Sequence, residues 1–368
     1  MGVHRTGSAR AETLDHLDEL ALLTETAGGV VAGRIVQERA RFDAATLIGK
    51  GKAHEIASRV KAEKIDLVIF DDELQPAQIR NLEKIIGAAV IDRAALILDI
   101  FAGRARTREA RTQVELAQLE YLLPRLTRQW QHLSRQAGGT IGLKGVGETQ
   151  LELDRRLIRR RIAHLRLELA KVERSRKERR RGREGVFRAA LVGYTNAGKS
   201  TLFNALAAAG AARVEDRLFA TLDPLIRRGG TASTPYLLVD TVGFIRKLPH
   251  DLVASFRSTL EESADSELIL HVVDLAQRGV EARMAVTDEV LAGLGLRDRP
   301  TMVVFNKSDR AEAGAVERME SLYPDALIVS AVRGDGVAAL ARAIAAAARR
   351  SRGSEAPTGR TAAAGGSA

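Results

Sequence analysis

The nine residues Gly193–Thr201 (GYTNAGKST) carry the strongest chemical signal in the sequence. They fit the pattern G-x-x-x-x-G-K-[ST] and lie between an apolar stretch at 187–193 and a segment with helical character at 201–209. In such a motif, backbone N–H groups of a glycine-bearing turn and the N-terminus of the next helix bind phosphates. Lys199 would reach the β- and γ-phosphates of a nucleoside triphosphate, and the Ser200 hydroxyl would bind Mg²⁺. The motif predicts a phosphate-binding loop.

Three later segments each follow an apolar stretch that is typical of a buried strand. In the first, Asp240-Thr241-Val242-Gly243, Asp240 can hold Mg²⁺ through water and the Gly243 N–H can touch the γ-phosphate. In the second, Asn306-Lys307-Ser308-Asp309, Asp309 can accept two hydrogen bonds from guanine that adenine cannot offer. The third, Ser330-Ala331-Val332, can present a backbone N–H to the guanine O6. Their order and spacing resemble those of the translation-factor-related class of P-loop GTPases.

Between these motifs lies Phe219-Ala220-Thr221-Leu222-Asp223, where GTPases of this class carry the switch threonine that closes on Mg²⁺. We therefore expect Lys199, Thr221 and Gly243 to act in catalysis, and Ser200, Thr221 and Asp240 to bind Mg²⁺. The predicted nucleotide-binding residues are Gly193, Tyr194, Thr195, Asn196, Ala197, Gly198, Lys199, Ser200, Thr201, Phe219, Ala220, Thr221, Leu222, Asp223, Asp240, Thr241, Val242, Gly243, Asn306, Lys307, Ser308, Asp309, Ser330, Ala331 and Val332.

Two residues of these motifs predict how hydrolysis proceeds. Phe244 follows Gly243, at the position where Ras-like proteins carry the glutamine that orients the attacking water. A phenyl ring cannot hydrogen-bond to water, so we expect slow hydrolysis by the protein alone, with the missing polar group supplied by another segment or by a partner. Asn196 stands where several relatives with the form G-x-x-N-x-G-K-S bind a potassium ion. A purely structural role for Asn196 in the loop is the alternative.

The elements that must position these motifs follow from the pattern of apolar residues. Apolar stretches at 187–193, 236–240, 267–274, 301–306 and 326–330 alternate with helical segments, which predicts a doubly wound, mostly parallel sheet. Upstream, expected strands at 66–70 and 88–91 flank an expected helix at 76–86. The predicted fold class is therefore α/β, with a small N-terminal α/β domain and a C-terminal Ras-like P-loop GTPase domain.

A basic helical hairpin is expected between these two domains. The chain of 368 residues has a net charge of +10, and residues 155–183 alone hold fourteen Lys and Arg against three Glu. Apolar residues recur at helical spacing in two arms that flank the glycine-rich stretch 138–147. The first arm carries Leu119, Leu122, Leu126 and Leu133, and the second carries Leu151, Ile158, Ile162, Leu165, Leu169 and Val172. We predict an antiparallel hairpin with a glycine loop at its tip.

The expected organisation comprises five parts. These are a flexible N-terminus at 1–17, the α/β domain at 18–104, the hairpin at 105–184, the GTPase domain at 185–350 and a disordered tail at 351–368.

The absence of cysteine excludes disulfides, cysteine-ligated metals and thiol catalysis. Since no apolar run approaches the ~20 residues that span a bilayer and no signal peptide is evident, we expect a cytoplasmic, monomeric protein without stable membrane insertion.

The N-terminal half resembles the HflX family of GTPases, and the resemblance extends over about residues 20–350. The segments that carry it are Thr46–Lys52, Asp71–Glu83, Asp92–Phe101, Gln113–Leu119, Tyr121–Leu126 and Gly147–Arg156, together with Gly193–Ser200 and Phe219–Pro224. It implies a GTPase that binds the large ribosomal subunit and splits or rescues stalled ribosomes, with hydrolysis stimulated by the ribosome. The hairpin would then contact ribosomal RNA.

The candidate RNA-contacting residues are Lys144, Arg155, Arg156, Arg159, Arg160 and Arg161. This chain departs from the family pattern in the loop, where Lys144 and Val146 replace the usual Arg and Pro, and we expect it to be without the further C-terminal domain of some members. Two other functions stay open at this point. One is an RNA-binding protein whose affinity is merely switched by nucleotide, and the other is a membrane-surface GTPase whose basic hairpin binds anionic lipid.

Overall fold

The computed structural model describes residues 1–7, 10–126, 150–181, 186–207, 218–219, 225–247, 266–277 and 279–354. The chain divides into two compact units. Unit 1 comprises Met1–Gly182 with two later segments, Glu215–Asp223 and Val242–Leu260, and unit 2 comprises Arg183–Val214, Pro224–Thr241 and Glu261–Ala368. The N-terminal domain and the hairpin, which the sequence suggested as separate parts, therefore lie in one unit.

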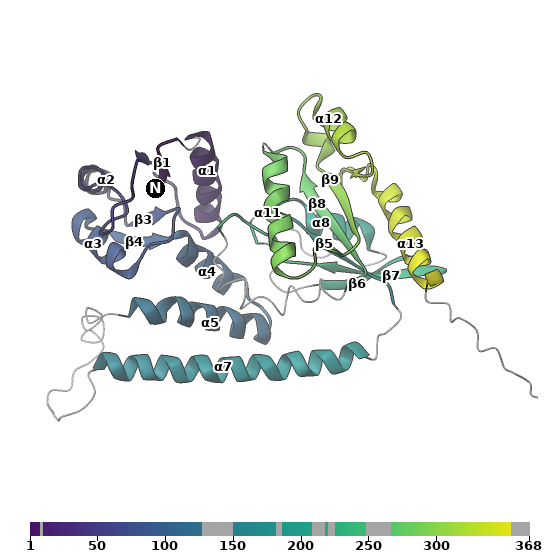
Figure 1. Cartoon of the computed structure of the whole chain (residues 1–368), viewed down its shortest axis with the longest axis horizontal. Helices are drawn as coiled ribbons and strands as arrows, with labels where there is room; N and C mark the ends of the chain where they lie inside the picture. The colour runs from purple at the N-terminus through teal and green to yellow at the C-terminus, as the bar shows by residue number, and fades with distance from the viewer. Residues whose placement is uncertain are drawn as a thin grey trace, which may run out of the picture. The chain divides into compact units, whose positions relative to one another are not determined.

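Unit 1 begins with a small α/β arrangement that contains two parallel strand pairs (Figure 1). Its elements are β1 (Gly2–Arg5), α1 (Arg10–Thr26), β2 (Val36–Arg39), α2 (Lys50–Glu63), β3 (Leu67–Phe70), α3 (Pro76–Ile86), β4 (Ala89–Asp92) and α4 (Arg93–Arg104). Strand β1 pairs with β2, and β3 pairs with β4. Ile48, Phe70, Leu74 and Leu82 are fully buried between the sheets and helices.

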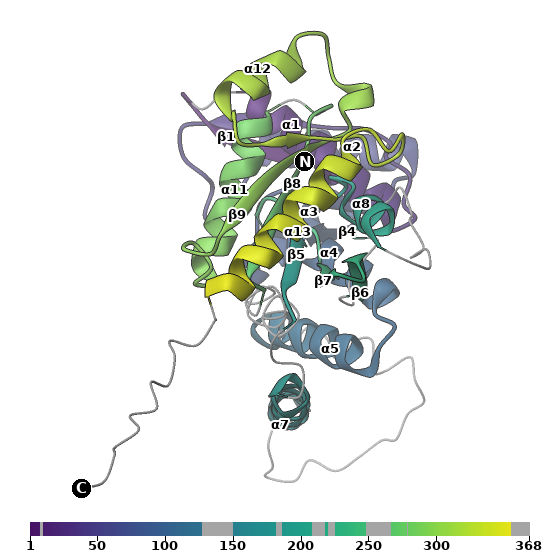
Figure 2. The same ribbon diagram turned by 90° about the vertical axis from the view of Figure 1, so that its right-hand side faces the viewer.

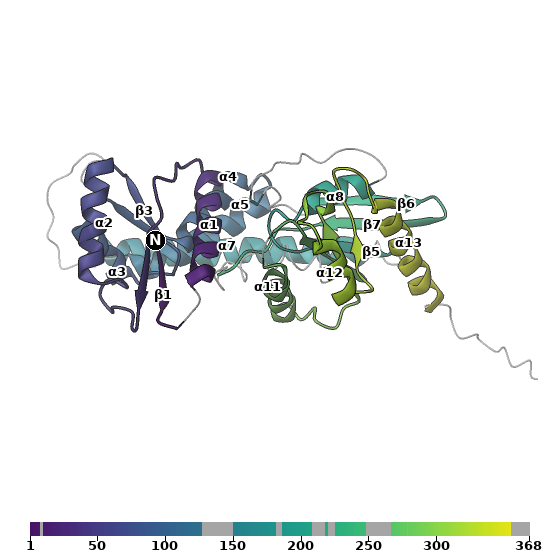
Figure 3. The same cartoon turned by 90° about the horizontal axis from the view of Figure 1, so that it is seen from above.

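Two helices form the base of the predicted hairpin. Helix α5 (Arg108–Leu122) and helix α7 (Gln150–Arg181) run side by side in Figures 1 and 3, and Figure 2 views α7 end-on. Their apolar seam buries Leu116, Ile162 and Leu165, with Leu119, Leu123, Ile158 and Leu169 packed against it. The sequence predicted most of this seam but not Leu116 or Leu123.

Helix α5 ends at Leu122 and is followed by a 3₁₀ turn, Leu123–Arg125, since Pro124 lacks the N–H that would continue the helix. Leu133 and the glycine-rich stretch 138–147, including Lys144, lie outside the described residues.

Unit 2 is built on a six-stranded sheet in the order β10-β9-β8-β5-β7-β6. Its elements are β5 (Arg188–Val192), α8 (Lys199–Leu206), β6 (Leu225–Thr231), β7 (Thr234–Asp240), β8 (Leu268–Asp274), α11 (Val280–Gly293), β9 (Thr301–Asn306), a 3₁₀ turn (Ser308–Arg310), α12 (Ala315–Leu322), β10 (Leu327–Ile328) and α13 (Val337–Ser354). All neighbours pair in parallel except β6, which is antiparallel to β7. The carboxyl ends of the parallel strands therefore meet at one edge of the sheet.

The structure differs from the sequence-based prediction at both ends of the chain. Within residues 1–17, expected to be flexible, Gly2–Arg5 form β1 and α1 begins at Arg10, because Val3 and Leu17 are buried in unit 1. At the other end α13 continues to Ser354, beyond the expected limit at residue 350. Strand β6 was not predicted at all, since LIRRGGT has no alternation of apolar and polar residues. None of the helices among the described residues is long and apolar enough to cross a membrane.

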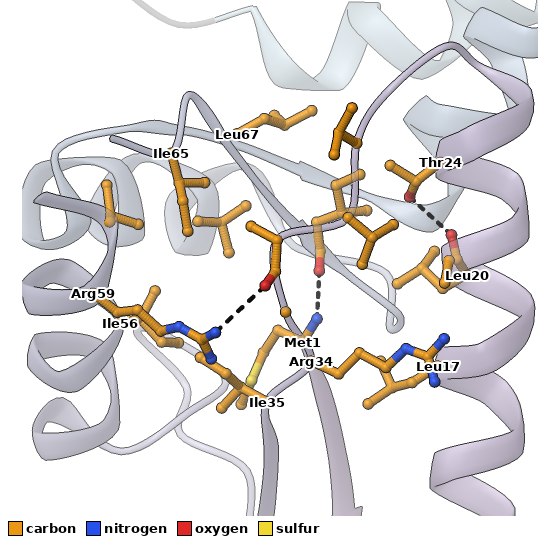
Figure 4. A pocket seen from close by; sticks show the side chains of 18 residues that line it. Met1, Leu17, Leu20, Thr24, Arg34, Ile35, Ile56, Arg59, Ile65 and Leu67 are labelled. Atoms are coloured by element: carbon orange, nitrogen blue, oxygen red, sulfur yellow. Dashed lines mark hydrogen bonds between the residues drawn. The ribbon is translucent and has the colours of Figure 1, made fainter. Parts of the chain in front are cut away.

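Unit 1 also holds an apolar cavity of about 130 Å³ between α1, α2 and β3 (Figure 4). Leu17, Leu20, Ile56 and Leu67 line it, and the Arg59 guanidinium at its wall donates to the carbonyl of Ala32 at 3.5 Å. None of its lining residues belongs to the predicted nucleotide site. The candidate site must therefore be sought at the sheet edge of unit 2.

Candidate nucleotide site

The turn from β5 into α8 has a shape that only glycine permits at two positions. Gly193 has φ of +145°, and a Cβ there would lie 2.1 Å from the carbonyl oxygen of Val272. Gly198 has φ of +86°, and a Cβ there would lie 2.3 Å from the Asn306 amide nitrogen. Asn196, between them, also adopts a left-handed conformation, with φ of +59°. Successive turns of this kind direct backbone N–H groups into a concavity suited to an anion, so the geometry agrees with a phosphate-binding loop.

Lys199, the first residue of α8, is buried beneath this loop, with a relative exposure of 6%. Its ammonium donates to the carbonyl oxygens of Gly193 at 3.0 Å and Tyr194 at 2.9 Å. Burial lowers the pKa of Lys199 to about 8; Asp240 opposes this shift and Lys307 adds to it. The sheet edge thus holds a cation that pays a desolvation cost and that a phosphate would stabilise.

Two oxygen ligands suited to Mg²⁺ meet beside Lys199. The Ser200 hydroxyl donates to Asp240 Oδ2 at 2.7 Å, and Asp240, at the end of β7, is fully buried. The next residue is fixed by its own side chain, since the Thr241 hydroxyl donates to the carbonyl of Leu191 at 2.6 Å. A hydroxyl and a carboxylate are hard oxygen donors of the kind that Mg²⁺ prefers. Thr221, the third predicted ligand, lies outside the described residues.

Asn306 joins the two segments predicted to bind guanine to the phosphate-binding loop. Its amide nitrogen donates to the carbonyl of Ala197 at 2.9 Å, and its amide oxygen accepts from the Ala331 N–H at 3.0 Å. The Ser330 hydroxyl donates to Asp309 Oδ1 at 2.6 Å, and this bond is the main reason that the pKa of Asp309 is lowered. The Asp309 carboxylate is therefore kept ionised and oriented. The structure thus brings together Asn306, Asp309, Ser330 and Ala331.

Two charged residues around these motifs were not predicted from the sequence. Asp274, at the end of β8, forms an ion pair with Lys307 at 2.9 Å. Arg283 of α11 lies over the ring of Tyr194, with its guanidinium carbon 5.0 Å from the ring centroid. Asp274 could have been found from its place at the carboxyl end of an apolar strand. Arg283 could not have been found from the sequence, because the periodicity of residues along a helix does not reveal which loop residue a side chain contacts.

The segments that carry the predicted switch residues belong to unit 1. Glu215–Asp223 and Val242–Leu260 are grouped with the N-terminal residues. Phe219 meets Phe101 of α4 edge-to-face, with 4.7 Å between the ring centroids. Lys247 Nζ lies 2.6 Å from Asp71 Oδ2 and 2.6 Å from Asp72 Oδ1. Val242, Gly243 and Phe244 belong to the same segment, whereas Ala220, Leu222 and Asp223 lie outside the described residues.

Asp71 also belongs to a buried charge cluster that fixes this part of unit 1. Arg93 lies 2.6 Å from Asp71 Oδ1 and forms a second ion pair with Glu19. Burial alone would raise the pKa of Asp71, but Arg93 and Lys247 outweigh burial and hold the pKa below its usual value. Buried carboxylates are tolerated when paired and hydrogen-bonded in this way.

A six-stranded sheet with a glycine-shaped phosphate loop, a Ser–Asp pair and an ordered NKSD segment defines a P-loop GTPase, and comparison with known proteins agrees. Three family models match the chain: GTP-binding GTPase N-terminal at residues 14–102, GTP-binding GTPase middle region at 104–183, and 50S ribosome-binding GTPase at 188–307. The curated GTPase HflX of Flavobacterium psychrophilum is 47% identical over 84% of this chain and 74% of its own length. GTPase HflX of Escherichia coli is 46% identical over 90% of this chain and 78% of its own length.

The chain belongs to the HflX family of GTPases, which hydrolyse GTP to GDP and phosphate. Among solved structures, the crystal structure of SsGBP in complex with GDP aligns with a TM-score of 0.51 at 24% identity. That alignment covers 95% of this chain and 98% of the solved one, and it supports the fold alone. The resemblance noted from the sequence is therefore confirmed.

The pKa of Lys199 generates a prediction about protons taken up when nucleotide binds. Since the pKa is about 8 in the nucleotide-free protein and phosphates favour the ammonium form, binding of GDP at pH 8 should take up about half a proton. Uptake should rise toward about one proton at pH 9, and affinity should fall over the same interval. Titration calorimetry in buffers of different ionisation enthalpy measures the uptake.

His271 should not contribute to the measured proton uptake, because burial lowers its pKa to about 4 and it stays neutral at pH 8 and at pH 9. Lys199→Arg is the control, since a guanidinium does not deprotonate in this range. Binding enthalpies that are independent of the buffer at pH 8 and at pH 9 would show that Lys199 is already fully charged in the free protein.

Proposed function

We propose that this GTPase acts on the large ribosomal subunit in the cytoplasm, where it splits or rescues stalled ribosomes. The family model that matches residues 188–307 is described as a 50S ribosome-binding GTPase, which supports this partner. The observation that carries the proposal is the arrangement of arginines on α7. Cations of this helix that form no ion pair within the protein itself indicate a polyanionic partner.

Five of the arginines of α7 fall into two groups. Arg161 binds the Glu115 carboxylate at 2.7 and 2.8 Å, and Arg166 binds Glu120 at 2.6 Å, so both hold α7 against α5. Arg155 likewise donates to the carbonyl of Leu126 at 2.8 Å. Arg159 and Arg160 are exposed and form no ion pair with any residue that the structure describes. We therefore assign RNA contact to Arg159 and Arg160 ahead of Arg155 and Arg161.

This surface favours RNA over a lipid membrane. Ribosomal RNA presents closely spaced phosphates, and cations that neutralise them release counterions, which drives binding. An interfacial membrane helix instead needs a broad apolar face. Among the α7 side chains that the structure describes, residues 151–175, the exposed large hydrophobic ones are Leu157 and Leu167. A plain RNA-binding module is disfavoured because the family hydrolyses GTP.

We also propose a role for each residue of the nucleotide site, and the positions of Lys199, Ser200, Asp240 and Asp309 support these roles. Lys199 binds the β- and γ-phosphates, Ser200 and Asp240 hold Mg²⁺ together with Thr221, and Asp309 binds guanine. The Mg²⁺ ion, when bound, neutralises charge on the phosphates. Gly243 would donate its N–H to the γ-phosphate. Phe244, which is buried with 2% exposure, offers no hydrogen bond to water, and this supports slow hydrolysis until the ribosome supplies a polar group.

We further propose that Asn196 helps to bind potassium at the phosphate loop. Its left-handed backbone places it within the turn between Gly193 and Gly198, where a monovalent cation would offset phosphate charge. GTP hydrolysis by the wild type should be several-fold faster in KCl than in NaCl at equal ionic strength. The Asn196→Ala variant should lose most of that difference, and equal rates for the wild type in the two salts would remove potassium from the proposal.

Cosedimentation with purified large subunits tests the proposed partner. Arg159→Ala/Arg160→Ala should weaken binding in the GTPγS state about tenfold. It should also reduce the slope of log affinity against log salt concentration by about two, because two phosphate contacts are lost. GTP binding by the variant should be unchanged. The wild type should pellet with subunits in GTPγS and not in GDP.

Arg297→Ala/Arg342→Ala is the matched control, since it removes two exposed arginines from unit 2. It should bind subunits like the wild type. Pelleting of the wild type that is equal in GTPγS and GDP would contradict a nucleotide-controlled ribosome factor. Equal losses in the two double variants would show that net charge alone decides binding.

A further inference from the structure

Unit 1 has a second concentration of cations, at the carboxyl ends of β1 and β2. The parallel register pairs Arg5 with Arg39, so the two arginine side chains lie on the same face of this strand pair. Glu38 pairs with His4 and therefore points to the opposite face. Like charges placed opposite each other on a sheet repel.

Residues that follow these strands extend the cationic surface. Arg39 Nε donates to the carbonyl of Arg41 at 2.9 Å, which fixes the chain as it leaves β2. A Cβ on Gly49 would lie 2.4 Å from Arg39 Nη1, so the guanidinium rests directly against the backbone at Gly49. Lys50 comes next and is exposed, as is Arg41. Among the described residues, none of Arg39, Arg41 and Lys50 forms an ion pair.

Asp43, which follows Phe42 in the sequence, accepts hydrogen bonds within its own loop. Its Oδ1 accepts from the N–H of Ala45 at 2.8 Å and from the N–H and the hydroxyl of Thr46, each at 3.1 Å. The hydrogen bond from Ala45 is the main reason that the pKa of Asp43 is lowered. Asp43 shapes the loop and also interacts electrostatically with Arg39, whereas Arg41 and Lys50 form no ion pair with any described residue.

Phe42 adds a flat apolar group to this charged surface. Its side chain is 40% exposed, although phenylalanine is ordinarily buried. The guanidinium carbon of Arg5 lies 5.3 Å from its ring centroid, within the range of a cation–π contact. The ring is thus held at the surface by a cation instead of by a core. An exposed aromatic ring among arginines is the combination by which proteins bind unstacked bases and the phosphates that join them.

We propose that Arg5, Arg39, Arg41, Phe42 and Lys50, which we name the strand-end patch, bind a single-stranded segment of RNA. Phe42 stacks on a base, while Arg39, Arg41 and Lys50 contact phosphates. The proposal rests on the proposed function in that RNA is the partner, but it concerns a surface separate from α7. An acidic peptide would match the charges and would leave Phe42 without a role.

The test measures RNA binding in a background where α7 cannot contribute. The full chain carrying Arg159→Ala/Arg160→Ala is titrated into a fluorescein-labelled oligouridine of about a dozen nucleotides, a length within the usual single-strand site size, at two salt concentrations. Phe42→Ala should weaken binding about fivefold or more with an unchanged salt dependence, and Phe42→Trp should restore it. Arg41→Ala should weaken binding and lower the salt slope by about 0.7.

Lys61→Ala is the matched control, because Lys61 is an exposed cation in the last turn of α2. It should bind the oligouridine like the background, and circular dichroism should show that all variants are folded. Two results would overturn the proposal: Phe42→Ala and Arg41→Ala binding like Lys61→Ala, or oligoglutamate of equal charge competing as well as unlabelled RNA. Neither result touches the cosedimentation of the chain with ribosomal subunits, so failure of the strand-end patch and failure of the proposed function are distinguishable.

Discussion

The burial of the Lys199 ammonium is the constraint around which the nucleotide site is arranged. A buried cation is costly unless polar groups surround it, and here the carbonyls of Gly193 and Tyr194 accept hydrogen bonds from the ammonium while Asp240 lies nearby. That arrangement requires the tight turn at Gly193 against β8 and the buried end of β7. Asn306 then ties the same loop to the guanine-binding segments. The parallel sheet supplies all of these groups at one edge because its strands end there.

The motifs of this candidate site could be recognised in the sequence because each follows an apolar strand at a spacing that one fold explains. Helix α3 was predicted at its observed bounds, since Pro76 opens it and Gly87 closes it in a left-handed conformation. Strand β6 and the ordered N-terminus were missed, because their stability comes from tertiary partners: β6 pairs with β7, and Val3 and Leu17 are buried in unit 1. The ion pairs of Lys247 with Asp71 and Asp72 join residues about 175 positions apart, which no local pattern reveals.

The structure divides the arginines of unit 1 according to what they do. Arg93 is buried with Asp71 and Glu19, where it stabilises the fold. Arg161 and Arg166 hold the two helices of the hairpin base together through Glu115 and Glu120. Arg159 and Arg160 remain exposed on α7, as does Arg41 beside Phe42. The positive charge that the sequence concentrated in one helix is therefore partly structural, and its unpaired part is what the proposed RNA contact uses.

The central proposal is that this GTPase requires the large ribosomal subunit for efficient hydrolysis. The most direct measurement is the rate of GTP hydrolysis by the purified protein alone, with purified large subunits, and with purified small subunits. We expect a slow rate alone, a rise of at least about tenfold with large subunits, which is about 1.4 kcal/mol of barrier lowering, and no rise with small subunits. A rate that is fast without ribosomes, or that rises equally with either subunit, would contradict the account.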